Sequence, residues 1–413
     1  MKKVLLAITL LILPISVCAL EYPKLDSKNV EIYDLTDKKI IYEYKSNEVS
    51  SIASLTKIAT TITAIENIEN LNEKVTITEE ILQTVSWDAS RAGLKAGDIV
   101  TYKDLLYASM LPSGADATNS IAILSSGSIE NFVKKMNDLV HKIGLFNTNF
   151  VNVTGLDEES NKSSADDVTK LLVYSLKNPI FKKLYTTKEY KMSNNQIIKS
   201  TIITNYNNPN YSTVKIIGNK TGYTKDAGYC LSSLTNINGH EVIIVLLNAS
   251  KQDNNYYHVI DTIKLINFLE KNYKERILVK KNESVKSIKV KLSNIDKYNI
   301  KASSNITKYL PSDYNKNLLK IKYDGDNSLT FLSRKGRNLG TVKYYYDGKL
   351  LYKEDAILKQ NIKINVIKVT KSYWYIILLI SIIVIYNLSK KKKVERGLYE
   401  KTKNRNIYRW MVP

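Results

Sequence analysis

The chain has 413 residues, which is long enough for two domains and a sizeable core. Its 61 Lys and Arg exceed its 40 Asp and Glu, giving a formal net charge of +21. No nucleic-acid-binding motif accompanies this charge, so we interpret it as compositional bias and attraction to anionic envelope polymers and lipid head groups. Of the two cysteines, we expect Cys18 to leave with an export signal, which excludes an intramolecular disulfide.

The first 19 residues have the pattern of a signal peptide. Lys2-Lys3 supply the positive region, Val4 to Val17 are mostly apolar, and Val17-Cys18-Ala19 offers a small-residue cleavage site. The alternative is lipidation of Cys18, but Val17 is larger than that processing usually accepts. We therefore expect ordinary cleavage after Ala19, with an exported mature chain.

Strand and helix patterns follow the signal. Val30 to Tyr44 is rich in β-forming residues and is interrupted at 36–39, which predicts a hairpin. Ser54 then opens a segment with isoleucines at helical spacing. Two further helical patterns flank residues 111–116, and Ser163-Ser-Ala-Asp166 has the pattern of a capping box at the start of another helix.

Two strong strand patterns occur late in this region, at 229–234 and 241–247. Asn238-Gly239 between them predicts a two-residue hairpin turn. A helical pattern from Val259 to Leu269 closes the region. Early strands, a helical middle, late strands and a closing helix predict an α+β domain over residues 25–272, with one antiparallel sheet flanked by helices.

The residue pattern changes after Val279. Apolar and polar residues alternate from there on, and Asp347-Gly348 predicts another hairpin turn. We expect a small all-β domain over residues 279–366, serving as a stalk between the first domain and the membrane, or less favourably as a binding module. Residues 373–388 are uncharged and intensely apolar, and are followed by Lys390 to Lys393. This pattern predicts one transmembrane helix with a basic cytoplasmic tail over residues 389–413.

Three short motifs contain the residues that we expect to take part in a reaction. Ser54 and Lys57 are three residues apart, so both lie on one face at the start of a helix. An unprotonated lysine can take the proton of the serine hydroxyl, and a helix N-terminus favours negative charge at the reacting centre. Taken alone, the pair would be two ordinary polar residues of an exposed helix.

The second and third motifs lie downstream. Ser113 occupies a Pro/Gly-containing turn before a helix, where a hydroxyl can relay a proton, although most such residues are simply turn serines. Lys220 and Thr221 can hold a substrate carboxylate, and Gly222 allows the substrate backbone to come close. Each motif is weak alone. The ordered set S-x-x-K, S-x-N-like and K-T-G is typical of penicillin-binding proteins and class A β-lactamases.

The chain resembles the D-alanyl-D-alanine carboxypeptidases, the low-molecular-weight penicillin-binding proteins, over nearly the whole mature sequence. The segments that carry the resemblance are the nucleophile segment at 51–58, the stretches 97–107 and 111–117, Gly155-Leu156 with 163–167, Thr204-Asn205, and 218–224. The resemblance implies a β-lactamase/transpeptidase-like fold, a small β-rich domain and C-terminal membrane attachment.

The resemblance also implies residue roles. Ser54 would be the acylated nucleophile, Lys57 its general base and Ser113 the proton relay. Lys220 and Thr221 would bind the terminal carboxylate of a peptidoglycan stem peptide ending in D-Ala-D-Ala. The backbone N–H groups of Ser54 and Tyr223 would form the oxyanion hole, and β-lactams would be covalent inhibitors. No metal or other cofactor is implied, and no Cys/His cluster in the sequence has the spacing of a metal site.

One departure from the family pattern concerns the second motif, where Ala115 replaces the usual Asn. This removes an amide that would contact the substrate and the base lysine; Asn119, one helical turn on, is the residue we expect to compensate in part. The departure affects efficiency and substrate preference more than the nucleophile.

Two other functions are compatible with the motifs. A serine β-lactamase would need a base for rapid deacylation, and Asp157, Glu158, Glu159 and Asn161 lie in the appropriate region, but their pattern matches poorly. A catalytically impaired penicillin-binding-like envelope protein is the third interpretation, and retention of all the reactive side chains argues against it. The sequence leaves open the balance of carboxypeptidase, endopeptidase and transpeptidase activity.

Overall fold

The computed structural model describes residues 20–206, 212–253 and 255–408. The described chain forms two compact units. The first unit runs to Glu275 and also includes Tyr309–Tyr314, and the second comprises Arg276–Lys308 and the chain from Asn315 onward. The predicted signal peptide lies outside the described residues.

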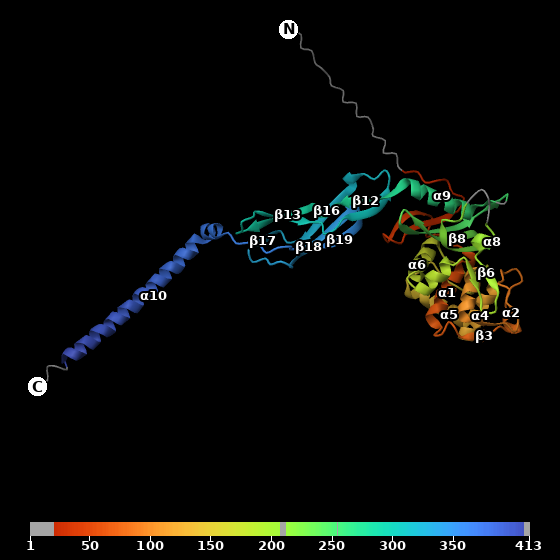
Figure 1. Cartoon of the computed structure of the whole chain (residues 1–413), viewed down its shortest axis with the longest axis horizontal. Coiled ribbons are helices and arrows are strands. Elements are labelled where there is room, and N and C mark those ends of the chain that lie inside the picture. The colour runs from red at the N-terminus through yellow and green to blue at the C-terminus, as the bar shows by residue number, and fades with distance from the viewer. Residues whose placement is uncertain (1–19, 207–211, 254, 409–413) are drawn as a thin grey trace, which may run out of the picture. The chain divides into compact units, whose positions relative to one another are not determined.

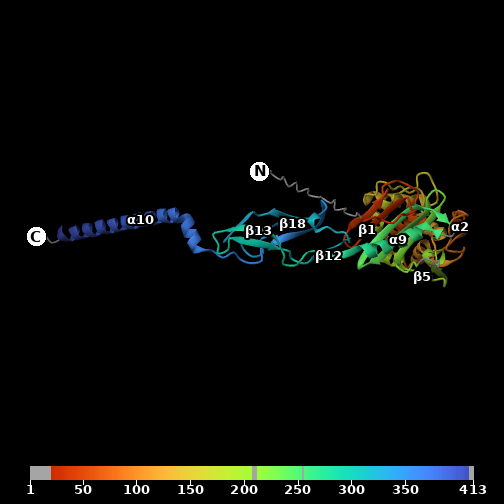
Figure 2. The same ribbon diagram turned by 90° about the horizontal axis from the view of Figure 1, so that it is seen from above.

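The first unit is built on one antiparallel sheet of five strands (Figures 1 and 2). Its order is β2 (Lys39–Tyr44), β1 (Asn29–Asp34), β9 (His240–Ala249), β8 (Gly228–Ile237) and β7 (Ile216–Thr224). The early hairpin therefore joins the late strands through the pairing of β1 with β9, as the sequence predicts. β7 lies at one edge of the sheet, and Lys220 on it is paired with Ser232 of β8.

The turn between β8 and β9 confirms the predicted hairpin. Asn238 and Gly239 have φ angles of 53° and 90°, the left-handed conformation that a type I′ turn requires at both central positions. This turn sets the register in which alternate residues of β9 face the two sides of the sheet.

The sheet separates two apolar cores. Ile243, Val245 and Leu247 of β9 belong to the core shared with the helical region, whereas Val242, Ile244 and Leu246 belong to the core beneath α9 (Tyr257–Asn272). Because side chains of a strand alternate between faces, a strand buried on both faces is apolar along its whole length. The apolar run at 242–247 is explained in this way.

The helical region lies on one side of the sheet. Its helices are α1 (Thr56–Asn67), α2 (Glu79–Gln83), α3 (Tyr102–Met110), α4 (Ala115–Ser126), α5 (Ile129–Lys142), α6 (Ala165–Ser175) and α7 (Pro179–Thr186). The short helix α8 (Thr201–Thr204) contributes Ile202 to the other core, the one beneath α9. α1 is buried from Thr56 to Ala64, so it is the central helix of this region. The helical region also contains two short antiparallel strand pairs. β3 (Lys74–Thr76) pairs with β4 (Ile99–Thr101), and β5 (Glu189–Lys191) pairs with β6 (Ile197–Lys199). β10 (Lys251–Gln252) pairs with β11 (Asn255–Tyr256) before α9.

The N-cap of α6 lies one residue later than the predicted capping box places it. The N-cap is Ser164, whose hydroxyl accepts a hydrogen bond from the backbone N–H of Asp167. Ser163 is unavailable for this role because its backbone pairs with Ser50 and its hydroxyl bonds the hydroxyl of Thr148. Tertiary pairing therefore decides between two adjacent serines.

The second unit is rich in β-structure, as predicted. It contains a three-stranded sheet of β14 (Lys297–Lys301), β13 (Ser284–Lys291) and β17 (Ser328–Thr330), and another of β16 (Leu319–Gly325), β18 (Asn338–Tyr346) and β19 (Lys349–Ile357). β12 (Tyr273–Val279) and β15 (Ile306–Pro311) pair with each other. The assignment of Tyr309–Tyr314 to the first unit is a feature that the sequence pattern does not reveal.

The C-terminal helix α10 spans Val366–Tyr408 and has a non-helical residue at Tyr373, which divides it into two stretches. Among the described residues it is the one helix long and apolar enough to cross a membrane, judged by length and composition. Its apolar side chains from Tyr373 to Leu388 are exposed, so no part of the described fold covers them.

Candidate active site

The nucleophile pair sits where the chain enters the central helix. Ser54 belongs to a 3₁₀ turn, Ala53–Leu55, immediately before α1, and Lys57 lies in the first turn of α1. The Nζ atom of Lys57 lies 3.0 Å from Ser54 Oγ and donates to the Thr154 carbonyl at 2.6 Å. Lys57 is 2% exposed, and its burial lowers the pKa of the ammonium to about 7, against a smaller opposing effect of Asp116.

Two glycines allow neighbouring backbone to approach this turn. A Cβ on Gly155, whose φ is +85°, would lie 1.9 Å from the Ala53 carbonyl oxygen. A Cβ on Gly222 of β7 would lie 2.8 Å from the backbone nitrogen of Ser54. Both distances are shorter than any ordinary carbon contact, so glycine is required at each position. The edge of β7 therefore lies directly against the nucleophile turn.

The second motif meets the third through a buried contact. Ser113 lies between α3 and α4 with a φ of 64°, a strained conformation for a residue with a side chain. The Nζ atom of Lys220 donates to Ser113 Oγ at 2.9 Å and to the Thr221 carbonyl at 2.7 Å. Burial, with a contribution from the charge of Lys57, holds the pKa of Lys220 well below its ordinary value. A bound carboxylate would supply the missing counter-charge.

The rest of the K-T-G motif lies along the same strand. Thr221 is buried and its hydroxyl lies 2.6 Å from the hydroxyl of Thr201 at the start of α8. Tyr223 follows Gly222 and is 57% exposed. The structure thus groups Ser54 with Lys57, Ser113 with Lys220, and Thr221 with Thr201, with β7 running past the nucleophile turn.

Ala115 is the first residue of α4 and is buried. The expectation that Asn119 partly replaces the amide missing at position 115 is wrong. The amide nitrogen of Asn119 donates instead to the hydroxyl and carbonyl of Thr84, at 2.9 and 3.3 Å. Its side chain therefore holds α2 against α4. Asp116 instead has a structural role near the site: its carboxylate accepts the backbone N–H groups of three consecutive residues, 92–94.

The loop that supplies the Thr154 carbonyl is fixed from two directions. The Asn152 side-chain oxygen accepts the backbone N–H groups of Thr154 and Gly155 at 3.2 and 2.7 Å. Asp157 accepts the Thr224 hydroxyl at 2.5 Å and the backbone N–H of Asp226 at 3.2 Å. The loop whose Thr154 carbonyl orients Lys57 is therefore joined to the end of β7.

Two of the acidic residues considered for a β-lactamase, Asp157 and Glu158, are engaged in hydrogen bonds of the loop itself or with the end of β7. Asp157 is bound to Thr224, and the Glu158 carboxylate accepts the amide of Asn152 at 2.7 Å. Asn161 is buried and accepts the backbone N–H of Val151, and Glu159 is exposed. None of these contacts directs a carboxylate toward Ser54, so the geometry gives this loop an orienting role.

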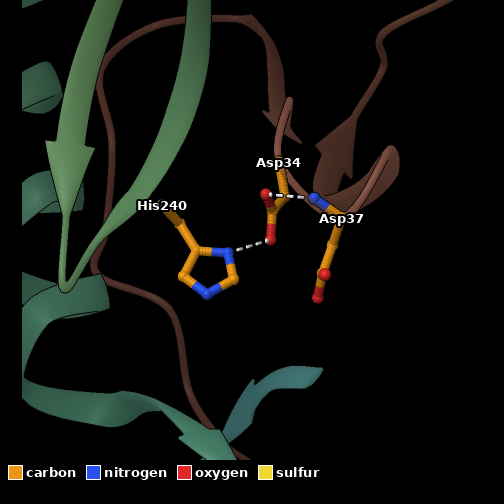
Figure 3. A group of neighbouring side chains, drawn as sticks. All are labelled: Asp34, Asp37 and His240. Atoms are coloured by element: carbon orange, nitrogen blue, oxygen red, sulfur yellow. Dashed lines mark hydrogen bonds and ion pairs between the residues drawn. The ribbon is translucent and has the colours of Figure 1, made fainter. Parts of the chain in front are cut away.

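A separate cluster of Asp34, Asp37 and His240 has its potential ligand atoms within 4.8 Å of one another (Figure 3). Asp34 accepts the backbone N–H of Asp37 at 2.8 Å and bonds the Nδ1 atom of His240 at 3.1 Å. The ammonium of Lys39 lies 3.5 Å from Asp37 and already supplies a cation. With the His240 ring stacked on Tyr309, the cluster is a polar contact that holds the β1–β2 turn and Tyr309–Tyr314 in the first unit.

Fold and site together define a serine acyl-transfer enzyme of the penicillin-binding type. Residues 17–251 match the family model "D-alanyl-D-alanine carboxypeptidase", and residues 273–364 match "Penicillin-binding protein 5, C-terminal domain". The chain therefore belongs to the D-alanyl-D-alanine carboxypeptidase family, a family of serine hydrolases acting in peptidoglycan metabolism. The predicted family and fold class are confirmed.

Individual relatives agree with this assignment. The D-alanyl-D-alanine carboxypeptidase DacF of Bacillus subtilis is 29% identical, with 84% of this chain aligned to 90% of that protein. A D-alanyl-D-alanine endopeptidase of Escherichia coli is 31% identical, with 60% of this chain aligned to 78% of that protein. The solved structure of a peptidoglycan synthesis regulatory factor (PBP3) from Streptococcus pneumoniae shares the fold, with a TM-score of 0.65, 23% identity, and coverage of 83% of this chain and 100% of that one.

Proposed function

We propose that this chain is a membrane-anchored D-Ala-D-Ala carboxypeptidase that removes the terminal D-alanine of peptidoglycan stem peptides through an acyl-enzyme on Ser54. The observation that carries the proposal is the pairing of Ser54 with a buried Lys57 beside the edge strand that bears Lys220. A buried lysine with a pKa near 7 is partly neutral at physiological pH, as a general base must be.

Acylation begins with proton transfer from the Ser54 hydroxyl to Lys57. The donor bond from Lys57 to the Thr154 carbonyl orients the amine, so that its lone pair can face Ser54. The serine oxygen then bonds to the carbonyl carbon of the penultimate D-alanine, and the amide C–N bond breaks. The transferred proton returns to the departing amine, with Ser113 as the relay, and free D-alanine leaves.

Lys220 and Thr221 would position the substrate during this step. A terminal carboxylate placed against them meets an ammonium and a hydroxyl on a rigid strand. The developing oxyanion would be bound by the backbone N–H groups of Ser54 and Tyr223. The close approach of Gly222 to the Ser54 nitrogen supports this, because it brings the two backbone segments together.

Deacylation is the attack of water on the Ser54 ester, with Lys57 again taking the proton. Penicillin mimics the D-Ala-D-Ala end and would acylate the same serine. Because the carboxylates of Asp157 and Glu158 are engaged in the loop, we propose slow release of the penicilloyl group, in contrast to a β-lactamase.

The proposal is tested by intact mass after incubation with penicillin. The adduct should lie on a peptide containing Ser54, and Ser54→Ala should abolish labelling and D-alanine release. Ser51→Ala, in the same peptide and also buried, is the matched control and should retain both. Undiminished labelling of folded Ser54→Ala protein would remove the assignment.

We further propose that residues 25–272 form the peptidase domain and residues 279–366 the small β-rich domain, followed by a membrane span over 373–388. Export by the N-terminal signal would place both domains outside, and the tail over 389–413 would be cytoplasmic. The exposed apolar surface of α10 supports the anchor, and the lysines from Lys390 support the orientation by the positive-inside rule.

A further inference from the structure

A pocket lies in the second unit, where the β-rich part meets the start of α10. Its volume is about 540 Å³, and the lining residues that matter here are Lys291, Asp296, Thr330, Lys368, Lys371 and Tyr373. Lys291 ends β13 and is paired with Thr330 of β17, so these two strands form one wall. The first stretch of α10, before the break at Tyr373, forms the other wall. None of these residues takes part in the chemistry proposed for D-alanine removal.

Hydrogen bonds hold the two walls together. The backbone N–H of Asn365, just before α10 begins, donates to the Leu292 carbonyl at 3.0 Å. One turn into the helix, the Nζ atom of Lys368 donates to the Ser293 carbonyl at 3.0 Å and to Asp296 Oδ1 at 2.7 Å. The start of α10 is therefore fixed against the segment that follows β13, and the pocket is a built feature of this unit.

The pocket has an excess of positive charge. Its acidic residue, Asp296, is already paired with Lys368. Lys291 and Lys371 also line the pocket and are exposed, and neither ammonium has a hydrogen bond or ion pair with any residue that the structure describes. An anion is therefore the ligand that complements this lining. Lysine binds phosphate as a point charge, and the hydroxyl of Thr330 can donate a further hydrogen bond.

The adjoining apolar run determines which anion can reach the pocket. Tyr373 lines the pocket and also begins the uncharged stretch 373–388, which we propose as the membrane span. Trp374 and Tyr375 follow it and are exposed, and such aromatic side chains lie at the level of the lipid head groups. The pocket then lies at the head groups of the leaflet that faces the peptidase domain, where lipid phosphates are concentrated.

We infer that this pocket binds the headgroup phosphate of an anionic phospholipid. The ligand class is a phosphodiester lipid whose head group carries no amine, because a headgroup amine would need a carboxylate and Asp296 is already paired with Lys368. Leu292, which also lines the pocket, offers apolar contact for the glycerol carbons. The bound lipid would join β13 and β17 to the start of α10 at the membrane surface. This inference rests on the proposed membrane anchor, which brings the pocket to the lipid.

The experiment uses the full-length protein in phosphatidylcholine nanodiscs that contain a small fraction of a photoreactive lipid. The probe is phosphatidylglycerol with a diazirine beside its headgroup phosphate, and the matched probe is phosphatidylcholine with the diazirine in the same position. After irradiation, mass spectrometry of proteolytic peptides locates the label. We expect the phosphatidylglycerol probe to label residues 290–292 and 330 at least fivefold more than the matched probe does. Both probes should label residues 373–376, because any lipid of that leaflet can lie there.

Substitution of the two unpaired lysines tests the pocket itself. Lys291→Gln combined with Lys371→Gln should lower the phosphatidylglycerol label on residues 290–292 and 330 at least fivefold. Lys363→Gln is the matched control, because Lys363 is an exposed lysine shortly before α10 and does not line the pocket. Its label should stay within twofold of the wild type. Penicillin acylation should be unchanged in both variants, because these lysines lie outside the peptidase domain.

Equal labelling of residues 290–292 by the two probes, or a label that the double variant leaves unchanged, would overturn the inference. Soluble glycerol phosphate or polyglycerol phosphate, added at the concentration of the lipid probe, should not displace the label. Displacement would also overturn the inference, because the pocket would then select a free phosphate ester or a wall polymer over a lipid. Absence of label at 373–376 with both probes would instead overturn the proposed membrane anchor, on which the inference rests.

Discussion

Lys57 Nζ lies 3.0 Å from Ser54 Oγ and belongs to a side chain that is almost completely removed from solvent. Desolvation penalises the ammonium more than the amine, which is why the pKa of this lysine falls to about 7. The packing that places Lys57 against Ser54 therefore also leaves part of this lysine unprotonated at neutral pH, as a general base must be.

Acylation by penicillin should therefore increase with pH through a midpoint near 7, because only the neutral amine of Lys57 accepts the Ser54 proton. Below the midpoint the rate constant should fall about tenfold per pH unit, since one proton blocks the base. Second-order acylation rates measured between pH 5 and 9 check this. Lys57→Arg, which remains charged throughout, should be slower by at least about 10²-fold at pH 8. A flat wild-type profile would exclude Lys57 as the base.

The hydrogen bond between Asp157 and Thr224 should influence the pKa of Lys57, although neither residue contacts the lysine. Asp157→Ala removes two hydrogen bonds that join the Thr154 loop to the end of β7, so Lys57 should become better hydrated. We expect the midpoint of the acylation pH profile to move upward toward that of an ordinary lysine, and stability to fall by about 1 kcal/mol. Glu159→Ala, exposed in the same loop, is the control for a change of charge. An unmoved midpoint would show that the loop does not govern Lys57.

Local sequence patterns were sufficient to predict the features that depend only on residues close together in the chain. Ser54 and Lys57 meet because residues three apart share a helix face, and Asn238-Gly239 forms its turn because its backbone conformation is local. The antiparallel sheet could also be inferred, since strand-like segments at both ends of one domain need partners.

Other features depend on contacts between distant segments and carry no local signature. The Thr154 carbonyl reaches Lys57 from 97 residues away, and the Asp157–Thr224 bond spans 67 residues. Asn119 could be assigned to the active site by its helical spacing, but the adjacent helix α2 offers it Thr84 instead. The side chain's direction on α4 was the information that the sequence lacked.

Restoring the family's usual amide at position 115 tests whether that departure matters. Ala115→Asn should raise turnover of a D-Ala-D-Ala peptide about fivefold or more, because one well-placed polar contact contributes on the order of 1–3 kcal/mol. Asn119 does not supply this contact, so no substitute already present should mask the gain. Ala115→Leu has similar bulk without the amide and should not raise turnover. Unchanged steady-state kinetics for Ala115→Asn would show that the reaction does not need the amide.

The orientation of α10 can be tested on intact cells. Its exposed apolar stretch and the lysines from Lys390 predict an external peptidase domain and an internal tail. External protease should remove the penicillin-binding domain, while an epitope placed after Trp410 should remain protected. Digestion of the epitope from outside would show that the helix lies along the membrane surface instead of crossing it.

Truncation before Lys371 tests whether the same helix is the anchor. The shortened protein keeps every motif of the proposed site, because Lys220, Thr221 and Tyr223 lie far upstream of the cut. It should therefore be released into the soluble fraction and still be acylated by penicillin at the rate of the full chain. Burial of apolar surface in lipid is what holds the intact helix, so high salt should not extract the full-length protein whereas detergent should. Retention of the truncated protein in the membrane fraction after a high-salt wash would show that the β-rich domain or an uncleaved signal segment also attaches it.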